Sequence, residues 1–335
     1  MLIPAIKLVQ AQPQYEAIVA GYGYAMERFS RKKIQHCEID PVQKEDFSLI
    51  DRYAPDLLIT SATSLPAVDM SEKHLWQQAR QRGVHSLAFL DQWQNYKVRF
   101  SGIHDEELLA YQPDWINCLN DIGKSEMMRE GFDEARLIAF GHPYLSSLKH
   151  DLLALDMGRI RSNLCLAAND EVVLFVSEPI REYYGDRRGY DQYVVLDYFL
   201  TNFAGSANQT KILIKLHPKD DITKFLDIGE RFKALPLRFV GNELSPLECL
   251  AISDSIFGMT SIMLIEAYVL GKKTASLQPG LCVEDPMVLS RHNLIPVMLS
   301  SQKCNLLELE HQQLSRFDID FKAEKLLDFI GEILH

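Results

Sequence analysis

The chain has 335 residues, which is enough for two ordinary domains. Hydrophobic residues make up 47% of it and charged residues 24%, as in globular proteins with packed cores. The net charge of −11 at pH 7 argues against a general binder of nucleic acid or of anionic membranes, because both recruit basic surfaces.

The first half alternates predicted helices and strands. It opens with a helix over residues 2–10. The predicted strands cover residues 15–20, 33–39, 56–61, 84–90, 115–119 and 137–140. Such alternation predicts an α/β domain with a parallel sheet, which we assign to residues 1–150.

One strand of this half delivers polar residues to its carboxyl end. The strand over residues 84–90 is followed by Asp91 and by a polar and aromatic run over residues 92–96. Parallel sheets bind ligands outside the carboxyl ends of their strands. Asp91 is therefore the best candidate for a general base that takes a proton from an acceptor hydroxyl. The alternative is an aspartate that only forms a turn.

A second α/β series begins at Val172, after a polar connector over residues 144–169. Its predicted strands cover residues 172–176, 211–216, 237–240, 255–257 and 274–277. The last predicted element is an amphipathic helix over residues 321–334. We assign residues 151–335 to this second domain, with a terminal helix that could pack back on the first.

Three polar loops follow strands of the second series, so a parallel sheet would bring them to one edge. Their candidate binding residues are Ser177, Glu178, His217, Pro218, Lys219, Gly258, Thr260 and Ser261. Hydroxyls, helix-terminal amides, an imidazole and an ammonium are the groups that a nucleotide diphosphate needs. Gly258 would permit an unusual backbone angle, and Thr260 or Ser261 would cap the next helix.

That next helix, over residues 262–270, is apolar except for Glu266. Glu266 lies about 9 Å along the helix axis from the Thr260 end, close to the separation of a nucleotide's phosphates from its ribose. A carboxylate suits ribose hydroxyls, and a helix N-terminus suits phosphate. The alternative is a structural carboxylate that binds a neighbouring backbone or arginine group.

The segments 212–221 (ILIKLHPKDD), 239–242 (FVGN) and 245–273 resemble the nucleotide-binding half of GT-B glycosyltransferases. The likeness is to bacterial surface-polysaccharide enzymes with an HP motif, among them sialyltransferase-like, capsule-associated and glycerophosphotransferase relatives. It implies two Rossmann-like domains, a donor phosphate or base contact for His217, phosphate contacts for Thr260 and Ser261, and a ribose contact for Glu266. The run 55–100 is similar to the acceptor-side half.

The first domain departs from that family because it lacks the first strand and glycine-rich loop that should precede the first helix. Its strand over residues 15–20 would then be central or exposed, and an exposed strand edge invites pairing with a second chain or a partner. This departure also motivates an interpretation as a non-catalytic GT-B-like binding protein.

The leading functional hypothesis is a metal-independent glycosyltransferase that moves a sugar from a nucleotide donor to a carbohydrate acceptor, with His217 and Asp91 as catalytic residues. The main alternative is a non-hydrolysing nucleotide-sugar 2-epimerase, for which the first half offers Asp91 and His142 as acid and base groups.

No metal or cofactor is expected, because the histidines show no metal-ligand spacing and no P-loop is present in the sequence. Asp318 and Asp320 have the D-x-D spacing of metal-dependent transferases, but they lie just before the terminal helix and not after a central strand, so we interpret them as a surface cap. The scattered cysteines form no Cys-x-x-Cys pair, and the sequence lacks a signal peptide and a roughly 20-residue apolar run. These features predict a cytoplasmic protein without a membrane segment.

Overall fold

The computed structural model describes residues 1–203, 210–302, 305–309 and 317–334. The chain forms two compact units, of which the first contains Met1–Ser147 and Asp318–His335 and the second contains Leu148–Phe317. The predicted α/β class, with two Rossmann-like domains and parallel sheets, is confirmed. No helix in the described ranges is long and apolar enough to cross a membrane.

The first unit is built on four parallel strands in the order β3-β4-β5-β6. Its strands are β1 (Ala20–Gly21), β2 (Cys37–Glu38), β3 (Leu57–Thr60), β4 (His85–Phe89), β5 (Trp115–Asn117) and β6 (Leu137–Ile138). Its helices are α1 (Ile3–Gln10), α2 (Tyr24–Arg31), α3 (Ser48–Tyr53), α4 (Ser71–Arg82), α5 (Tyr96–Arg99), α6 (Asp121–Arg129) and α15 (Ala323–Leu334), with α7 (Pro143–Leu153) leading into the second unit.

The prediction of a strand over residues 15–20 is wrong. Only Ala20 of that range is in a strand, and β1 pairs with β2 in a separate two-residue ladder outside the main sheet. Local apolar alternation was present, but the structure offers these residues no long partner strand. The expected exposed edge, and with it the reason for a partner there, therefore does not exist at residues 15–19. Helix α1 is the first described element, as the sequence predicted.

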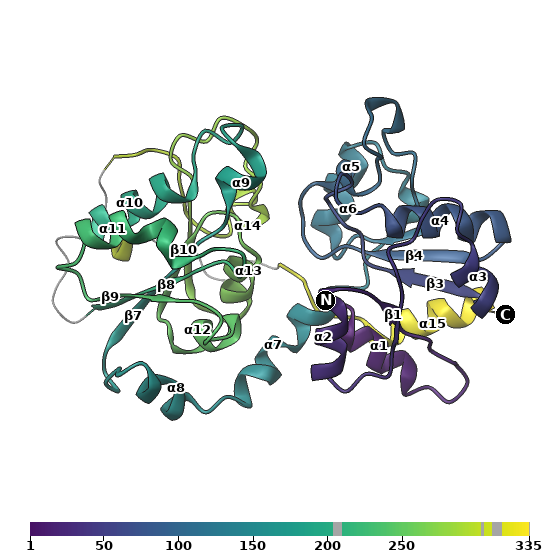
Figure 1. Ribbon diagram of the computed structural model, residues 1–335, viewed down its shortest axis with the longest axis horizontal. Helices are drawn as coiled ribbons and strands as arrows, with labels where there is room; N and C mark the ends of the chain where they lie inside the picture. Colours follow the sequence, from purple (N-terminus) through teal and green to yellow (C-terminus); the bar gives the residue numbers. More distant parts are fainter. Residues whose placement is uncertain (204–209, 303–304, 310–316, 335) are drawn as a thin grey trace. The chain divides into compact units, whose positions relative to one another are not determined.

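The last residues of the chain belong to the first unit, although the sequence divided the chain into 1–150 and 151–335. Figure 1 shows α15, in yellow, beside the blue and purple elements of this unit. Leu326 and Ile330 pack in one core with Leu87, Phe89 and Phe140. The amphipathic face of α15 thus completes the first hydrophobic core.

The second unit has six parallel strands in the order β12-β11-β10-β7-β8-β9. Its strands are β7 (Glu171–Val176), β8 (Thr210–Lys215), β9 (Leu237–Val240), β10 (Ser255–Gly258), β11 (Lys273–Leu277) and β12 (Val297–Met298). Its helices are α8 (Met157–Asn163), α9 (Ile180–Tyr184), α10 (Gln192–Phe203), α11 (Leu226–Arg231), α12 (Pro246–Ile252), α13 (Ile262–Val269) and α14 (Val288–Arg291).

Aromatic packing holds helix α10 against this sheet. Phe199 lies 5.0 Å from Phe175 and 5.6 Å from Phe257, measured between ring centroids. All three side chains are at most 1% exposed. The central strands are covered on both faces, which explains their continuous apolar sequences.

The order of strands reverses between β7 and β10, because β8 and β9 extend the sheet on one side of β7 and β10 to β12 extend it on the other. In open parallel sheets, ligands bind at the carboxyl ends of the strands next to such a reversal. The fold therefore directs attention to the residues that follow Val176 and Gly258.

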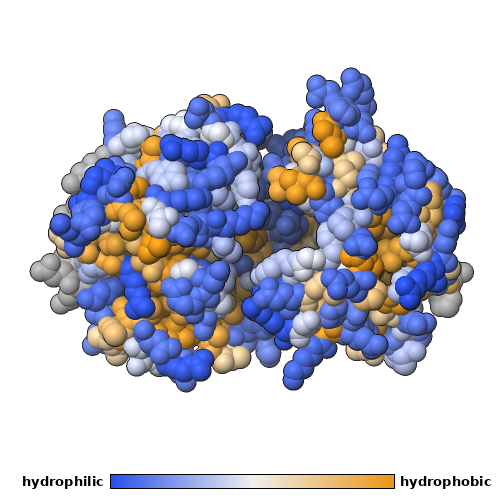
Figure 2. Space-filling view, in the orientation of Figure 1, coloured by the Kyte–Doolittle hydropathy of each residue, from blue (hydrophilic) through white to orange (hydrophobic). Residues whose placement is uncertain are grey.

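The hydropathy of the surface indicates the position of a site less specifically than the strand order does. Figure 2 shows hydrophilic residues over most of the visible face, with hydrophobic areas among them on both units. The side chains of Leu153 and Val68, for example, are 85% and 80% exposed. Single exposed apolar side chains of this kind are common and do not define a site.

Candidate functional site

The three predicted loops of the second unit leave neighbouring strands in register. Val176 of β7 is paired with Lys215 of β8 on one side and with Gly258 of β10 on the other. The loops that begin at Ser177, Leu216 and Met259 therefore start at one edge of the sheet. We call this set, at residues 177–179, 217–219 and 259–261, the strand-end site.

Gly258 is a regular strand residue, so the expected unusual backbone angle is wrong. A β-carbon at this position would lie 3.1 Å from the carbonyl oxygen of Val176. The glycine thus leaves room for a close approach of β10 to β7 just before the strand-end site.

Glu178 and Thr260 are in direct contact across the reversal point. The Glu178 carboxylate accepts the Thr260 backbone N–H at 2.6 Å and the Thr260 hydroxyl at 2.9 Å. The Thr260 hydroxyl in turn accepts a hydrogen bond from the Arg188 guanidinium at 2.9 Å. Burial raises the pKa of Glu178, and the hydrogen bonds from Thr260 and the charge of Arg188 oppose that rise.

Arg188 and Tyr190 were not predicted as site residues. Arg188 is 5% exposed, and its guanidinium lies 3.8 Å above the Tyr184 ring centroid. The Tyr190 hydroxyl donates to Gln278 at 3.1 Å. Both residues come from the loop after α9, where a dense run of Arg, Tyr and Gly (residues 181–190) was the available sequence signal.

Helix α13 presents its N-terminus to the same place. The Ser261 hydroxyl accepts from the Met263 N–H at 3.3 Å, so Ser261 is the N-cap that the sequence allowed. The partial positive charge of a helix N-terminus favours an anion. Thr260 is 5% exposed and Ser261 is half-buried.

Ser177, at the end of β7, is 2% exposed. Within the described ranges, its buried hydroxyl oxygen makes no hydrogen bond. A buried hydroxyl without a partner loses solvation that only a ligand or water could restore.

His217 is half-buried after β8. Its Nδ1 accepts the Lys219 N–H at 3.2 Å, so the proton of the neutral ring lies on Nε2. Burial lowers the pKa of His217; the charge of Asp220 opposes this, and nearby lysines lower the pKa further. Neutral His217 can therefore donate from Nε2 to a ligand oxygen. Pro218 and Lys219 are exposed, with the Lys219 ammonium 5.3 Å from the Tyr183 ring centroid.

Glu266 is 3% exposed on α13, between Ile265 and Ala267, which are equally buried. The expected helix with one internal carboxylate is present. A contact between Glu266 and a ribose stays a prediction.

In the first unit, Asp91 follows β4 and forms an ion pair with Arg99 at 2.7 Å. Half of the Asp91 side chain is exposed, whereas Arg99 is buried. His142 is 1% exposed, and burial lowers its pKa to about 4. Its Nδ1 accepts the Leu145 N–H at 3.2 Å, and Nε2 lies 3.1 Å from the Asp91 carbonyl oxygen. His142 therefore caps α7 as a neutral ring.

A second titratable cluster of the first unit was missed. Glu72 on α4 accepts hydrogen bonds from the Ser61 hydroxyl and the Thr63 N–H, which follow β3, and burial raises its pKa. Lys73 is fully buried, and burial lowers its pKa to about 8. The amphipathic pattern of α4 gave no sign that an ammonium would be inside.

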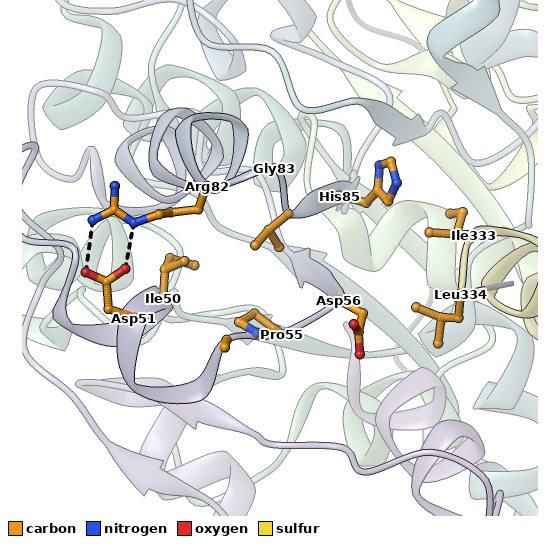
Figure 3. Close-up of a pocket in the computed structure, with 11 residues that line it drawn as sticks. Ile50, Asp51, Pro55, Asp56, Arg82, Gly83, His85, Ile333 and Leu334 are labelled. Atoms are coloured by element: carbon orange, nitrogen blue, oxygen red, sulfur yellow. Dashed lines mark hydrogen bonds and ion pairs between the residues drawn. The ribbon is translucent and has the colours of Figure 1, made fainter.

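A pocket in the first unit lies at the opposite, amino-terminal edge of the sheet. Figure 3 shows Ile333 and Leu334 of α15 near His85, and Arg82 paired with both oxygens of Asp51. Those two hydrogen bonds measure 2.7 and 3.0 Å. The pocket contains none of the predicted site residues, and parallel sheets bind substrates at their other edge.

The sequence matches no family model and no curated protein. The structure, in contrast, resembles solved proteins along almost its whole length. UDP-GlcNAc 2-epimerase from Neisseria meningitidis, bound to UDP-GlcNAc, is 12% identical with a TM-score of 0.70, covering 99% of this chain and 96% of that chain. MnaA of S. aureus with UDP is 13% identical with a TM-score of 0.67, covering 99% and 93%.

HepE of Anabaena with UDP-glucose is a more distant neighbour, 12% identical with a TM-score of 0.56, covering 98% of this chain and 87% of that chain. At such identities the likeness shows the fold, a GT-B-like pair of Rossmann-like domains. It does not by itself transfer an activity.

Proposed function

We propose that this protein is a non-hydrolysing nucleotide-sugar 2-epimerase. The fold similarity to UDP-GlcNAc 2-epimerases across both units carries this proposal. It favours the epimerase alternative of the sequence analysis over the glycosyltransferase that the HP motif suggested. The nucleotide part of the substrate would bind at the strand-end site of the second unit.

In this proposal the diphosphate lies at the N-terminus of α13, on Thr260 and Ser261. His217 donates its Nε2 proton to a phosphate oxygen, and exposed Lys219 adds positive charge at the edge. Glu266 stays the candidate partner for the ribose. No metal is required, because helix amides, hydroxyls and cationic side chains supply the stabilisation of the phosphates.

Epimerisation at C2 requires that a proton leave one face of the sugar and return to the other. As the proton leaves, the C2–H electron pair forms a C1–C2 double bond and the C1–O bond to the nucleoside diphosphate breaks. The bound diphosphate then adds back to C1 as a proton is delivered to the opposite face of C2. We assign the proton transfers to carboxylates at the carboxyl edge of the first sheet, with Asp91 as the first candidate and Glu72 as the second. His142 is a poor candidate, because its ring is buried and its pKa is about 4.

The test is incubation of the protein with UDP-GlcNAc in D2O, followed by NMR of the sugar. We expect the C2 epimer to form and deuterium to appear at C2, with no free sugar released. Asp91→Asn should abolish the exchange while UDP still binds. Binding without exchange at C2 in the wild type would contradict the epimerase proposal.

A non-catalytic binding protein is the second candidate, and one observation favours it. Of the two acid and base groups expected in the first unit, Asp91 is paired with Arg99 and His142 caps a helix. Under this proposal UDP-GlcNAc raises the melting temperature, by an amount equivalent to about 2.7 kcal/mol at 100 times Kd. No isotope exchange would accompany that shift.

A further inference from the structure

We propose that Glu178 is an internal anion that occupies the phosphate position of the strand-end site, so that an anionic ligand binds only when this carboxylate is displaced or protonated. The inference rests on the proposed nucleotide site and changes the part that Glu178 plays in it. The sequence pattern predicts Glu178 as a binding residue, whereas in the structure its carboxylate accepts the hydrogen bonds of the groups that a phosphate would use.

The donors expected to hold a phosphate are the amides and hydroxyls at the start of α13. The Thr260 N–H and hydroxyl both donate to Glu178, at 2.6 and 2.9 Å, and the Ser261 N–H also interacts with this carboxylate. A phosphate oxygen cannot accept these hydrogen bonds while the carboxylate does.

Arg188 brings a buried positive charge to the strand-end site. Arg188 is 5% exposed, and it reaches the site through its 2.9 Å hydrogen bond to the Thr260 hydroxyl. A buried guanidinium needs a nearby negative charge, and Glu178 provides it through the shared hydroxyl. An incoming sulfate or phosphate would replace one anion by another, so Arg188 keeps a counter-charge in both states.

Ser177, the residue before Glu178, has a buried and unsatisfied hydroxyl in the described part of the chain. The Ser177 hydroxyl oxygen is buried beside Glu178 and, in the described part of the chain, has no hydrogen-bond partner. A site adapted only to Glu178 would be expected to satisfy this hydroxyl. A larger anion, with more acceptor oxygens than a carboxylate, offers it a partner.

The proposal sets the direction of a pH response. Arg188 faces Glu178 through Thr260, and Tyr190 lies near both, with Asp285 acting on Tyr190. Tyr190 stays protonated near neutral pH, because burial raises its pKa. Burial also raises the pKa of Glu178. Acidification therefore neutralises the internal anion and should strengthen the binding of an external one.

The experiment uses sulfate, whose charge is constant between about pH 5 and 8, with binding followed by calorimetry or by NMR of the Thr260 and Ser261 amides. We expect Glu178→Gln to bind sulfate roughly tenfold more tightly than the wild type at pH 7.5. The wild-type affinity should rise as the pH falls from 8 to 5, and that of Glu178→Gln should change little.

Glu182→Gln is the matched control. It removes a carboxylate four residues away, one that binds Lys224 and Gln192 and does not contact Thr260. An equal gain in both variants would mean a general charge effect and would overturn the proposal. Equal or weaker binding by Glu178→Gln would also overturn it. The wild-type pH series needs no substitution, and a flat series contradicts the inference even where the variant does not fold.

The experiment distinguishes a failure of the proposed nucleotide site from a failure of the internal-anion proposal. If Glu178→Gln gains affinity for sulfate, but UDP and other nucleoside diphosphates bind no more tightly than sulfate, the internal anion stands and the nucleotide site does not. If UDP binds well and Glu178→Gln gains nothing for either ligand, the nucleotide site stands and the internal anion does not.

Discussion

The carboxyl edges of the two sheets satisfy their polar groups in different ways. In the second unit, a carboxylate, a hydroxyl and a guanidinium from three separate segments meet at the N-terminus of α13. In the first unit, Asn117 is fully buried and binds the Gly141 carbonyl at 2.9 Å, while its oxygen accepts the Leu119 and Phe140 N–H groups. The first edge is braced by backbone contacts, and the second is held by side chains that a ligand could replace.

The largest loss of stability is expected at Gly141, where the carboxyl edge of the first sheet contacts residues 318–321. Gly141 has a φ of +87°, and a β-carbon there would lie 2.0 Å from the Asp320 carbonyl oxygen. We expect Gly141→Ala to lower the free energy of unfolding by about 3 kcal/mol, from left-handed strain and displacement of the 318–321 segment. Chemical denaturation measures this. Gly131→Ala is the control, since Gly131 has a φ of +95° but no atom within 4 Å of the added carbon. Equal losses would contradict the contact as the cause.

The next largest effect is a loss of stability at low pH, caused by His142 in the first unit. The folded pKa of His142 is about 4, below its ordinary 6.5, so only the unfolded chain takes up this proton between those values. Stability should therefore fall as pH drops from about 6.5 to 4, by up to about 3 kcal/mol from this group. His142→Asn, whose oxygen can still accept the Leu145 N–H, should flatten the profile. Replacement of His150, whose side chain is 90% exposed, should leave the profile unchanged.

Glu266→Ala separates ligand binding from structure in the second unit. Loss of a buried carboxylate should lower stability by about 1.5–3 kcal/mol. If Glu266 also binds the ribose, UDP affinity should fall at least about tenfold beyond what the loss of folded protein explains. Glu248→Ala is the control, because Glu248 closes the capping box of α12 with Ser245 and does not belong to the strand-end site. An unchanged UDP affinity in Glu266→Ala would leave Glu266 a structural residue.

The smallest effect is expected at the pocket of Figure 3. Arg82 and Asp51 form a two-bond ion pair, but their side chains are 44% and 51% exposed. Exposed pairs contribute little after screening, so Arg82→Gln should change the melting temperature little. A melting scan at low and high salt would measure it. A loss of UDP binding in Arg82→Gln would contradict our placement of the functional edge.

The sequence predicted the second unit better than the first for a physical reason. Strands such as β7 and β10 are buried on both faces, and their uninterrupted apolar runs are distinctive. Residues 15–20 are also apolar in part, but a strand needs a partner, and pairing between distant segments leaves no mark in a local pattern. The amphipathic pattern of α15 did predict a helix that could pack back on the first domain, but its core partners Leu87 and Phe140 are far away in sequence and could not be identified from that pattern.

Some residues of the candidate site could be predicted from the sequence and others could not, for the same reason. Residues directly after strands, such as Glu178 and Thr260, could be identified because the sheet fixes where a strand ends. Arg188 could not, because its place depends on a loop in which Gly189 has a φ of +81° and lies against the Gly280 carbonyl. Lys73 could not either, since nothing in an amphipathic helix marks a lysine that is fully buried.

The return of residues 318–335 to the first unit bears on the order in which the protein folds during synthesis. Residues 1–147 are synthesised before residues 318–334, so the core of the first unit lacks Leu326 and Ile330 until the intervening second unit has been made. We expect the second unit to become protease-resistant on the ribosome before the first, against the order of synthesis. Chains truncated after residue 317, released from the ribosome and probed by limited proteolysis would show this, and resistance of the first unit in them would refute it.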